Sequence, residues 1–356
     1  MRGLRIAALA ATVLAAGAAS GHIVYARTSL HQLVAGADVV AQARISDLNA
    51  TAAAPNGARR PVVEAELLLV IKGNAQPGAV RFAQHGHGVA PFEGGEEVLL
   101  FLLRAEHAGE LAEFAAASGL PYVSLQEHDD RWSLAGDRGP ERLAAARGYA
   151  RIERIADGNA RAAEHRKLLA AQLTSPDTRL AASALGDLIV APDGLLGANQ
   201  LAPFEVVLAS PATTIGVRLG LLAELERRGL VAAGPHWAAL LRETRGAERR
   251  AALRAAALHP SPEVLGELLQ LLQDADAEVA SEAALALGAP ANLAALGSLA
   301  AALDSGAPRV RAATIRALGR IGGAGAGRVL EHAAASHTDP DTRERARAEA
   351  ALQSLR

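Results

Sequence analysis

The sequence contains no cysteine, and its single methionine is Met1. Disulfides, thiolate metal sites and cysteine nucleophiles are therefore excluded. Aromatic residues make up only 3% of the chain, although 50% of the residues are hydrophobic. The apolar mass consists mainly of Ala, Leu and Val, and such small side chains suit helices that pack closely and leave few large pockets.

Lysine is also scarce, because it occurs only at Lys72 and Lys167 and arginine carries the remaining positive charge. Lys and Arg together number 36 against 38 Asp and Glu, which gives a net charge of -2. This balance argues against a basic nucleic-acid-binding protein, and no stripe of aromatic residues is present on which bases would stack. We therefore expect no nucleic-acid partner.

The N-terminus has the order of a secretory signal peptide. Arginines precede an uncharged run at residues 6–16, and small residues follow it. We predict cleavage near Ala18 or Ala26, so that residues 1–26 are removed and the mature chain is exported to the periplasm or secreted. The alternative is that the segment is retained as a transmembrane anchor. No membrane span is expected after cleavage.

Residues 27–137 are predicted to form a small β domain. Short apolar segments separated by Gly, Pro and Asn predict strands at 39–45, 62–71, 79–83, 98–103, 122–126 and 131–134. Strands this short and closely spaced favour an antiparallel barrel or sandwich. Ser29–Val40, Leu69–Gly73 and Phe92–Leu102 resemble a domain of bacterial exported proteins whose role is unknown, and that resemblance implies no active site.

From Pro140 onward the apolar spacing becomes helical and the chain repeats itself. The segment Val310–Gly319 recurs 31 residues earlier at Val279–Gly288, and related segments begin at Arg179, Val217, Glu248 and Thr342. A fixed period of this size predicts stacked supersecondary units. A second amphipathic segment precedes each copy, so each unit is predicted to be a helix, a short turn and a second helix.

The repeated segment carries a recognisable signature. Val310–Gly319 follows the core of D-x-x-V-R-x-x-A-A-x-A-L-G, although Ala280 stands at the Arg position of the preceding copy and Glu248 and Thr342 replace the leading Val. In this the chain resembles the short HEAT repeats first noticed in phycobilin lyases. The resemblance implies an armadillo-like α-solenoid, a superhelix of about six α–α repeats, over 161–356. Residues 138–160 are then a helical bridge, and the fold class is α+β multidomain.

Few residues have the spacing of a chemical site. His85 and His87 alternate at a possible strand end, where they would hold a metal ion with help from Glu93, but their flanking glycines favour a solvated loop. The sequence has no catalytic triad, paired-carboxylate motif or cofactor fingerprint. We therefore predict no catalytic residues and no cofactor.

These features favour a non-catalytic exported scaffold that binds a protein or peptide. Two alternatives stay open. The repeat resemblance implies a bilin lyase or isomerase, and His85 with His87 would make the protein a periplasmic metal-binding or ligand-binding module.

The partner is expected on the concave face of the solenoid, which the second helices line in HEAT-type stacking. The candidate binding residues are the charged positions expected to be exposed there: Arg218, Arg249, Glu282, Arg311, Arg316 and Arg345. Their mixed signs favour a protein or peptide of alternating charge. The alternative is that they pair with acidic residues of neighbouring repeats, as a structural ladder.

Overall fold

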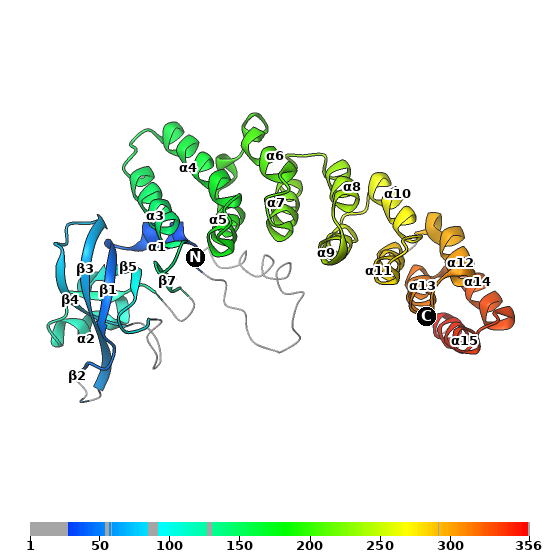
Figure 1. Cartoon of the computed structure of the whole chain (residues 1–356), viewed down its shortest axis with the longest axis horizontal. Helices are drawn as coiled ribbons and strands as arrows, with labels where there is room; N and C mark the ends of the chain where they lie inside the picture. Colours follow the sequence, from blue (N-terminus) through cyan, green and yellow to red (C-terminus); the bar gives the residue numbers. More distant parts are fainter. Residues whose placement is uncertain are drawn as a thin grey trace. The chain divides into compact units, whose positions relative to one another are not determined.

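The computed structural model describes residues 28–53, 57, 59–84, 92–126, 130–290 and 292–354. The predicted signal segment and the candidate ligands His85 and His87 lie outside the described residues. The chain divides into two compact units, residues 1–217 and 218–356 (Figure 1). Within the described ranges, no helix combines the length and the apolar character needed to cross a membrane.

The first unit contains a seven-stranded sheet, in which six strands lie at the predicted segments and the strand at 51–53 was not predicted. Its strands are β1 (Val39–Asp47), β2 (Thr51–Ala53), β3 (Arg59–Lys72), β4 (Gly78–Ala83), β5 (Glu97–Arg104), β6 (Tyr122–Ser124) and β7 (Trp132–Ser133). The strand order is β1-β3-β4-β6-β5-β7, and β1 also pairs with β5, so the pairings return to their starting strand.

The sheet is mixed rather than purely antiparallel, because β4 and β6 are parallel. A parallel neighbour requires a crossover of a dozen or more residues. Here the chain supplies it by running through β5 and the short helix α2 (Ala112–Ala117) before it reaches β6. Alternation along each strand did not reveal this pairing, because it does not specify the direction of the neighbour.

The remaining helices of the first unit are α1 (Leu30–Gly36), α3 (Gly139–Glu153), α4 (Gly158–Leu173), α5 (Thr178–Val190) and α6 (Ala202–Ala209). Neither α1 nor α2 was predicted. For α1 the sequence does hold a signal, since Ser29 and Gln32 form a capping box in which each side chain accepts a hydrogen bond from the other residue's backbone amide.

Both faces are buried in the first part of β1, Val39–Ala41. Val39, Ala41 and Ala43 contribute to one core within the sheet, whereas Val40 contributes to a second core that includes residues of α1, α3 and α5. This first part of the strand is continuously apolar because it is covered on both sides, whereas Gln42 and Arg44 alternate with buried residues farther along. The second core holds α1 between the sheet and the first helices.

Every helix predicted for the repeats is present. Helix α7 (Ile215–Arg227) crosses the boundary between the units, and the second unit continues with α8 (Ala233–Glu243), α9 (Gly246–Ala256), α10 (Pro262–Leu271), α11 (Ala277–Leu287), α12 (Leu296–Ser305), α13 (Pro308–Ile321), α14 (Gly323–Ser336) and α15 (Pro340–Ser354). The second helices of the repeats, α9, α11, α13 and α15, pack in series.

Small residues permit this close packing. A Cβ atom added to Gly288, at the end of α11, would lie 2.8 Å from the Cα atom of Ala317 on α13. No side chain fits at that distance, so the glycine is required by the approach of the two helices. The abundance of Ala and Gly therefore sets how tightly neighbouring repeats stack.

Candidate functional site

Three of the six predicted binding residues are arginines that pair with an acidic residue of the next repeat. Arg218 pairs with Glu243 at 2.7 Å, Arg249 with Asp274 at 2.8 Å and Arg311 with Asp339 at 3.0 Å. In each pair an arginine of one second helix reaches an acidic residue at the end or the turn of the next helix pair. The prediction that these three arginines are exposed is wrong. Arg218 is only 7% exposed, and the side chains of Arg249 and Arg311 are 11% and 16% exposed.

Two of these arginines also donate to a carbonyl oxygen in the turn before their own helix. Arg249 donates to the carbonyl oxygen of Thr244 at 2.8 Å, and Arg311 donates to that of Gly306 at 2.7 Å. Each arginine therefore joins the turn before its helix to the turn of the following repeat. We call this series of arginine–acid pairs the inter-repeat ladder. Ala280 occupies the corresponding position of α11, so that repeat lacks the arginine–acid pair.

The other three predicted residues differ in their surroundings. Glu282 on α11 is half-buried and lies 3.4 Å from Arg254 on α9. Arg316 and Arg345 are exposed. Among the described side chains, no acidic group pairs with Arg316, whose guanidinium donates to the carbonyl oxygen of Ala312 at 3.3 Å.

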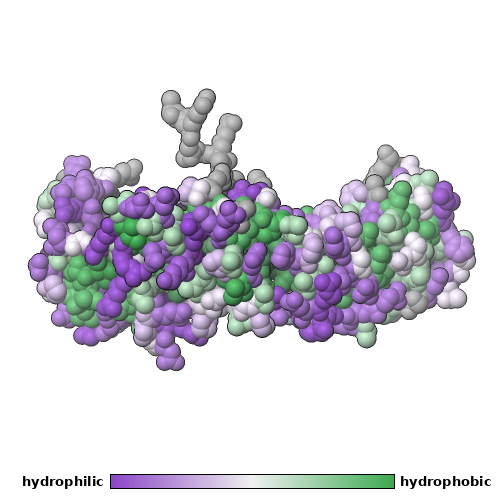
Figure 2. All heavy atoms as spheres, turned by 90° about the horizontal axis from the view of Figure 1, so that it is seen from above, coloured by the Kyte–Doolittle hydropathy of each residue, from purple (hydrophilic) through white to green (hydrophobic). Residues whose placement is uncertain are grey.

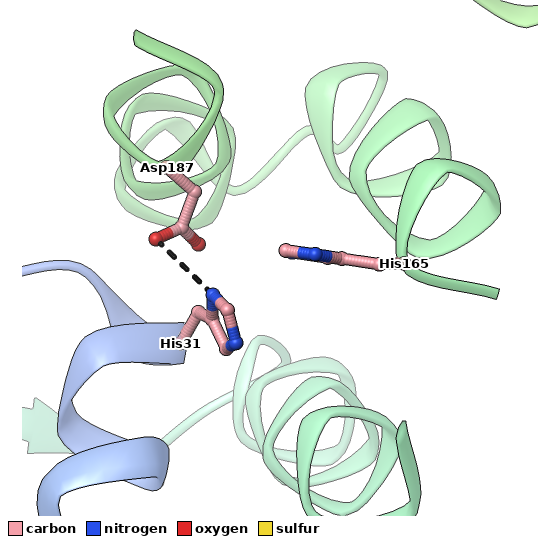
Figure 3. A group of neighbouring side chains, drawn as sticks. All are labelled: His31, His165 and Asp187. Carbon is pink, nitrogen blue, oxygen red and sulfur yellow. Dashed lines mark ion pairs between the residues drawn. The ribbon is translucent and has the colours of Figure 1, made fainter. Parts of the chain in front are cut away.

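A second candidate site lies in the first unit, and sequence reasoning missed it. His31 of α1, His165 of α4 and Asp187 of α5 point toward one another (Figure 3). One ligand atom from each of them lies within 4.8 Å of the others. The three residues are far apart in the sequence, and no local spacing connects them. We call these three residues the His–Asp cluster.

Hydrogen bonds hold the acidic member of the His–Asp cluster in place. The Asp187 carboxylate accepts from the Ser29 hydroxyl and from the Tyr149 hydroxyl, the latter at 3.0 Å. Next to it, Ser183 accepts from the backbone amide of Leu30 at 2.7 Å. The start of α1 is thereby attached to α5.

Burial controls the charge of the His–Asp cluster. Asp187 is 1% exposed at its side chain, and this burial raises its pKa to about 7, although hydrogen bonds from Ser29 and Tyr149 act in the opposite direction. Burial likewise lowers the pKa of His31, and burial together with the charge of His31 lowers the pKa of His165 to about 4. Near neutral pH both imidazoles are therefore uncharged.

The rings pack tightly around the carboxylate. The His31 ring stacks on Tyr149 with centroids 4.9 Å apart, and it meets His165 edge-on at 4.4 Å. The Nδ1 atom of His31 lies 3.8 Å from the Asp187 carboxylate. His31 thus contacts both other members of the His–Asp cluster.

His165 differs from its neighbours. Its Nε2 atom is buried and makes no hydrogen bond to any described residue. A buried polar atom left in this state costs about 1–3 kcal/mol. The hydrogen bonds that Asp187 accepts from Ser29 and Tyr149 therefore do not explain why a histidine is present at position 165.

The earlier metal candidates remain a prediction, because His85 and His87 lie outside the described residues. Their suggested third ligand, Glu93, is engaged elsewhere, since it forms an ion pair with Arg131 at 2.6 Å. Hydrogen bonding from Arg131 also lowers the pKa of Glu93.

Comparison with known proteins identifies the repeats. Residues 267–353 match the family model of HEAT repeats. This match confirms the HEAT-type repeat for the part of the chain from within α10 to α15.

The chain is also similar to solved structures. They include YibA of Escherichia coli, with 16% identity, a TM-score of 0.35 and coverage of 61% of this chain and 78% of YibA. Two engineered proteins show 20% and 18% identity with TM-scores of 0.31 and 0.29, covering 57% and 58% of this chain and 66% and 94% of theirs. No curated protein sequence matches significantly.

Proposed function

We propose that this chain, whose residues 267–353 form a HEAT-repeat array, is a non-catalytic scaffold that binds a protein or peptide partner. The match to HEAT repeats is the observation that carries the proposal, because such repeats are commonly protein-interaction modules. In HEAT-type stacking the second helices line the concave surface. We therefore place the partner on the layer formed by α9, α11, α13 and α15.

Exposed charges on this layer support that placement. Glu278 on α11 lies between two arginines, Arg250 of α9 at 3.0 Å and Arg309 of α13 at 2.8 Å. Exposed pairs of this kind contribute only about 0–1 kcal/mol to stability. A partner can therefore replace these ion pairs with its own at a small cost in free energy. The arginine–acid pairs of the inter-repeat ladder are less accessible and connect successive repeats.

The partner should carry charges of both signs. Arg316 lies on the same helix as Arg309, and a carboxylate of the partner would supply the acidic contact that the described residues do not give it. Figure 2 looks onto the side of the first helices, such as α8 and α10, where hydrophilic residues lie among separate hydrophobic patches. The proposed layer of second helices faces away from this view.

The test compares two charge reversals. Arg316→Glu changes an exposed arginine on α13, and Arg328→Glu changes an exposed arginine on α14, in the layer of first helices. The immobilised protein is used at low salt to capture proteins from a cell-envelope extract of its source. We expect Arg316→Glu to lose the captured partner and Arg328→Glu to retain it. Equal capture by both variants would contradict the proposed surface.

We also propose that the scaffold acts after export. The support is the order of charged, apolar and small residues in segment 1–26. Mass spectrometry of the protein isolated from its source should find a mature N-terminus at Ala19 or Arg27. An N-terminus at Met1, with the protein in the cytoplasmic fraction, would refute export.

A further inference from the structure

The starting point is the unexplained imidazole of the His–Asp cluster. The contacts around Asp187 account for Ser29 and Tyr149, which donate to its carboxylate. They do not account for His165, whose buried Nε2 atom has no hydrogen-bond partner among the residues that the structure describes. An imidazole nitrogen that is buried next to a second imidazole and a carboxylate is placed as a metal ligand would be.

We propose that His31, His165 and Asp187 bind a divalent transition-metal cation of the Zn²⁺ class. Two imidazoles and one carboxylate are a ligand set that suits zinc and related ions, with a further position open to water. Calcium and magnesium prefer oxygen ligands alone, and the chain has no thiolate to select softer ions.

The distances are close to those that an ion requires. The three ligand atoms lie within 4.8 Å of one another. Zinc–ligand bonds of about 2.0–2.1 Å in a tetrahedral arrangement place two ligand atoms about 3.3 Å apart. The ligands therefore need to approach by at most about 1.5 Å, a movement shared between two side chains.

The surroundings match those of a metal site. Metal-bound carboxylates and imidazoles are held by hydrogen bonds from further residues. Asp187 receives such bonds from Ser29 and Tyr149, and the latter also stacks on His31. The side chain of His31 is 28% exposed, which gives an ion a route from solvent to the buried carboxylate.

An ion held by these three side chains would connect α1, α4 and α5. Its role in this position is to fix the start of α1 to the first helical repeat.

The experiment measures Zn²⁺ binding by the mature protein without an affinity tag, after stripping with a chelator, by calorimetry and by thermal unfolding at pH 7.5. We expect one tightly bound ion per chain and a rise in the unfolding temperature when it binds. His165→Gln should weaken the affinity for Zn²⁺ at least about 100-fold. Substituting residues that only hydrogen-bond to a metal ligand already typically lowers metal affinity about 10–100-fold. His165→Gln should also abolish the rise.

His165→Gln is informative because no described residue hydrogen-bonds to the buried Nε2 atom of His165, so the substitution breaks no such bond. Apart from the lost ring contact with His31, the metal-free variant should keep the stability of the metal-free parent and unfold close to the same temperature, as checked by circular dichroism. Two controls should retain tight binding: His332→Gln, at an exposed position on α14, and the double variant His85→Ala/His87→Ala.

Three results would overturn the proposal. The first is that the stripped parent protein does not bind one Zn²⁺ ion per chain. The second is unchanged affinity in His165→Gln, and the third is loss of the ion only in the His85→Ala/His87→Ala variant.

Discussion

Arg311 and Arg316 lie on the same helix and should respond differently to removal. Arg311 is 16% exposed at its side chain and makes hydrogen bonds to Asp339 at 3.0 Å, to Thr342 at 2.9 Å and to the carbonyl oxygen of Gly306 at 2.7 Å. Arg316 is exposed and makes one long hydrogen bond, to Ala312. We expect Arg311→Ala to destabilise the second unit and Arg316→Ala to leave it nearly unchanged.

The magnitude follows from the contacts. A hydrogen bond to a charged group contributes about 1.5–3 kcal/mol when it is shielded from water. The bonds of Arg311 share one guanidinium, and Asp339 is exposed enough to regain water after the substitution. We therefore expect a total loss of about 2–3 kcal/mol for Arg311→Ala, and less than about 0.5 kcal/mol for Arg316→Ala.

The assay is urea unfolding of both variants, followed by circular dichroism at 222 nm. Repeat arrays can depart from two-state unfolding, so the midpoints and the slopes should both be compared. In thermal unfolding the expected loss corresponds to a drop of about 4–12 °C. If Arg316→Ala lowered stability as much as Arg311→Ala, or if neither did, the inter-repeat ladder would not have the structural role that its geometry indicates.

Two further predictions concern the second unit. The Thr342 hydroxyl helps to lower the pKa of Asp339 to about 2. Because the folded-state pKa lies below the ordinary 3.8, this contribution is present above about pH 4 and is lost as the pH falls toward 2. Urea titrations should show a shallower loss of stability over that range for Asp339→Asn, and an unchanged slope would contradict the assignment. Gly288→Ala should destabilise by about 1–3 kcal/mol, because its Cβ would approach Ala317 too closely. The control is Gly266→Ala on α10, where no described atom lies within 4 Å of the added Cβ. It should stabilise the protein by up to about 1 kcal/mol. Equal effects of the two substitutions in chemical unfolding would refute the packing argument.

Local sequence signals were sufficient for most of the elements. The spacing of apolar residues predicted each helix of the repeats, because one face of a helix in a stacked array must be apolar over successive turns. The period of the array and its HEAT-type signature were likewise visible in the sequence, because each repeat is a short continuous segment. Even α1, which we did not predict, carries its signal locally in the capping box of Ser29 and Gln32.

Properties that depend on distant partners were decided by the tertiary structure. Alternation along β4 and β6 does not specify their parallel pairing, since direction depends on the path of the chain between them. Arg311 and Arg316 are chemically identical, and only their contacts in the folded array, such as the ion pair of Arg311 with Asp339 of the next repeat, distinguish a structural arginine from an exposed one. The His–Asp cluster combines three helices that are distant in sequence. Its members gain their common environment only when packing excludes water and brings their ligand atoms within 4.8 Å of one another.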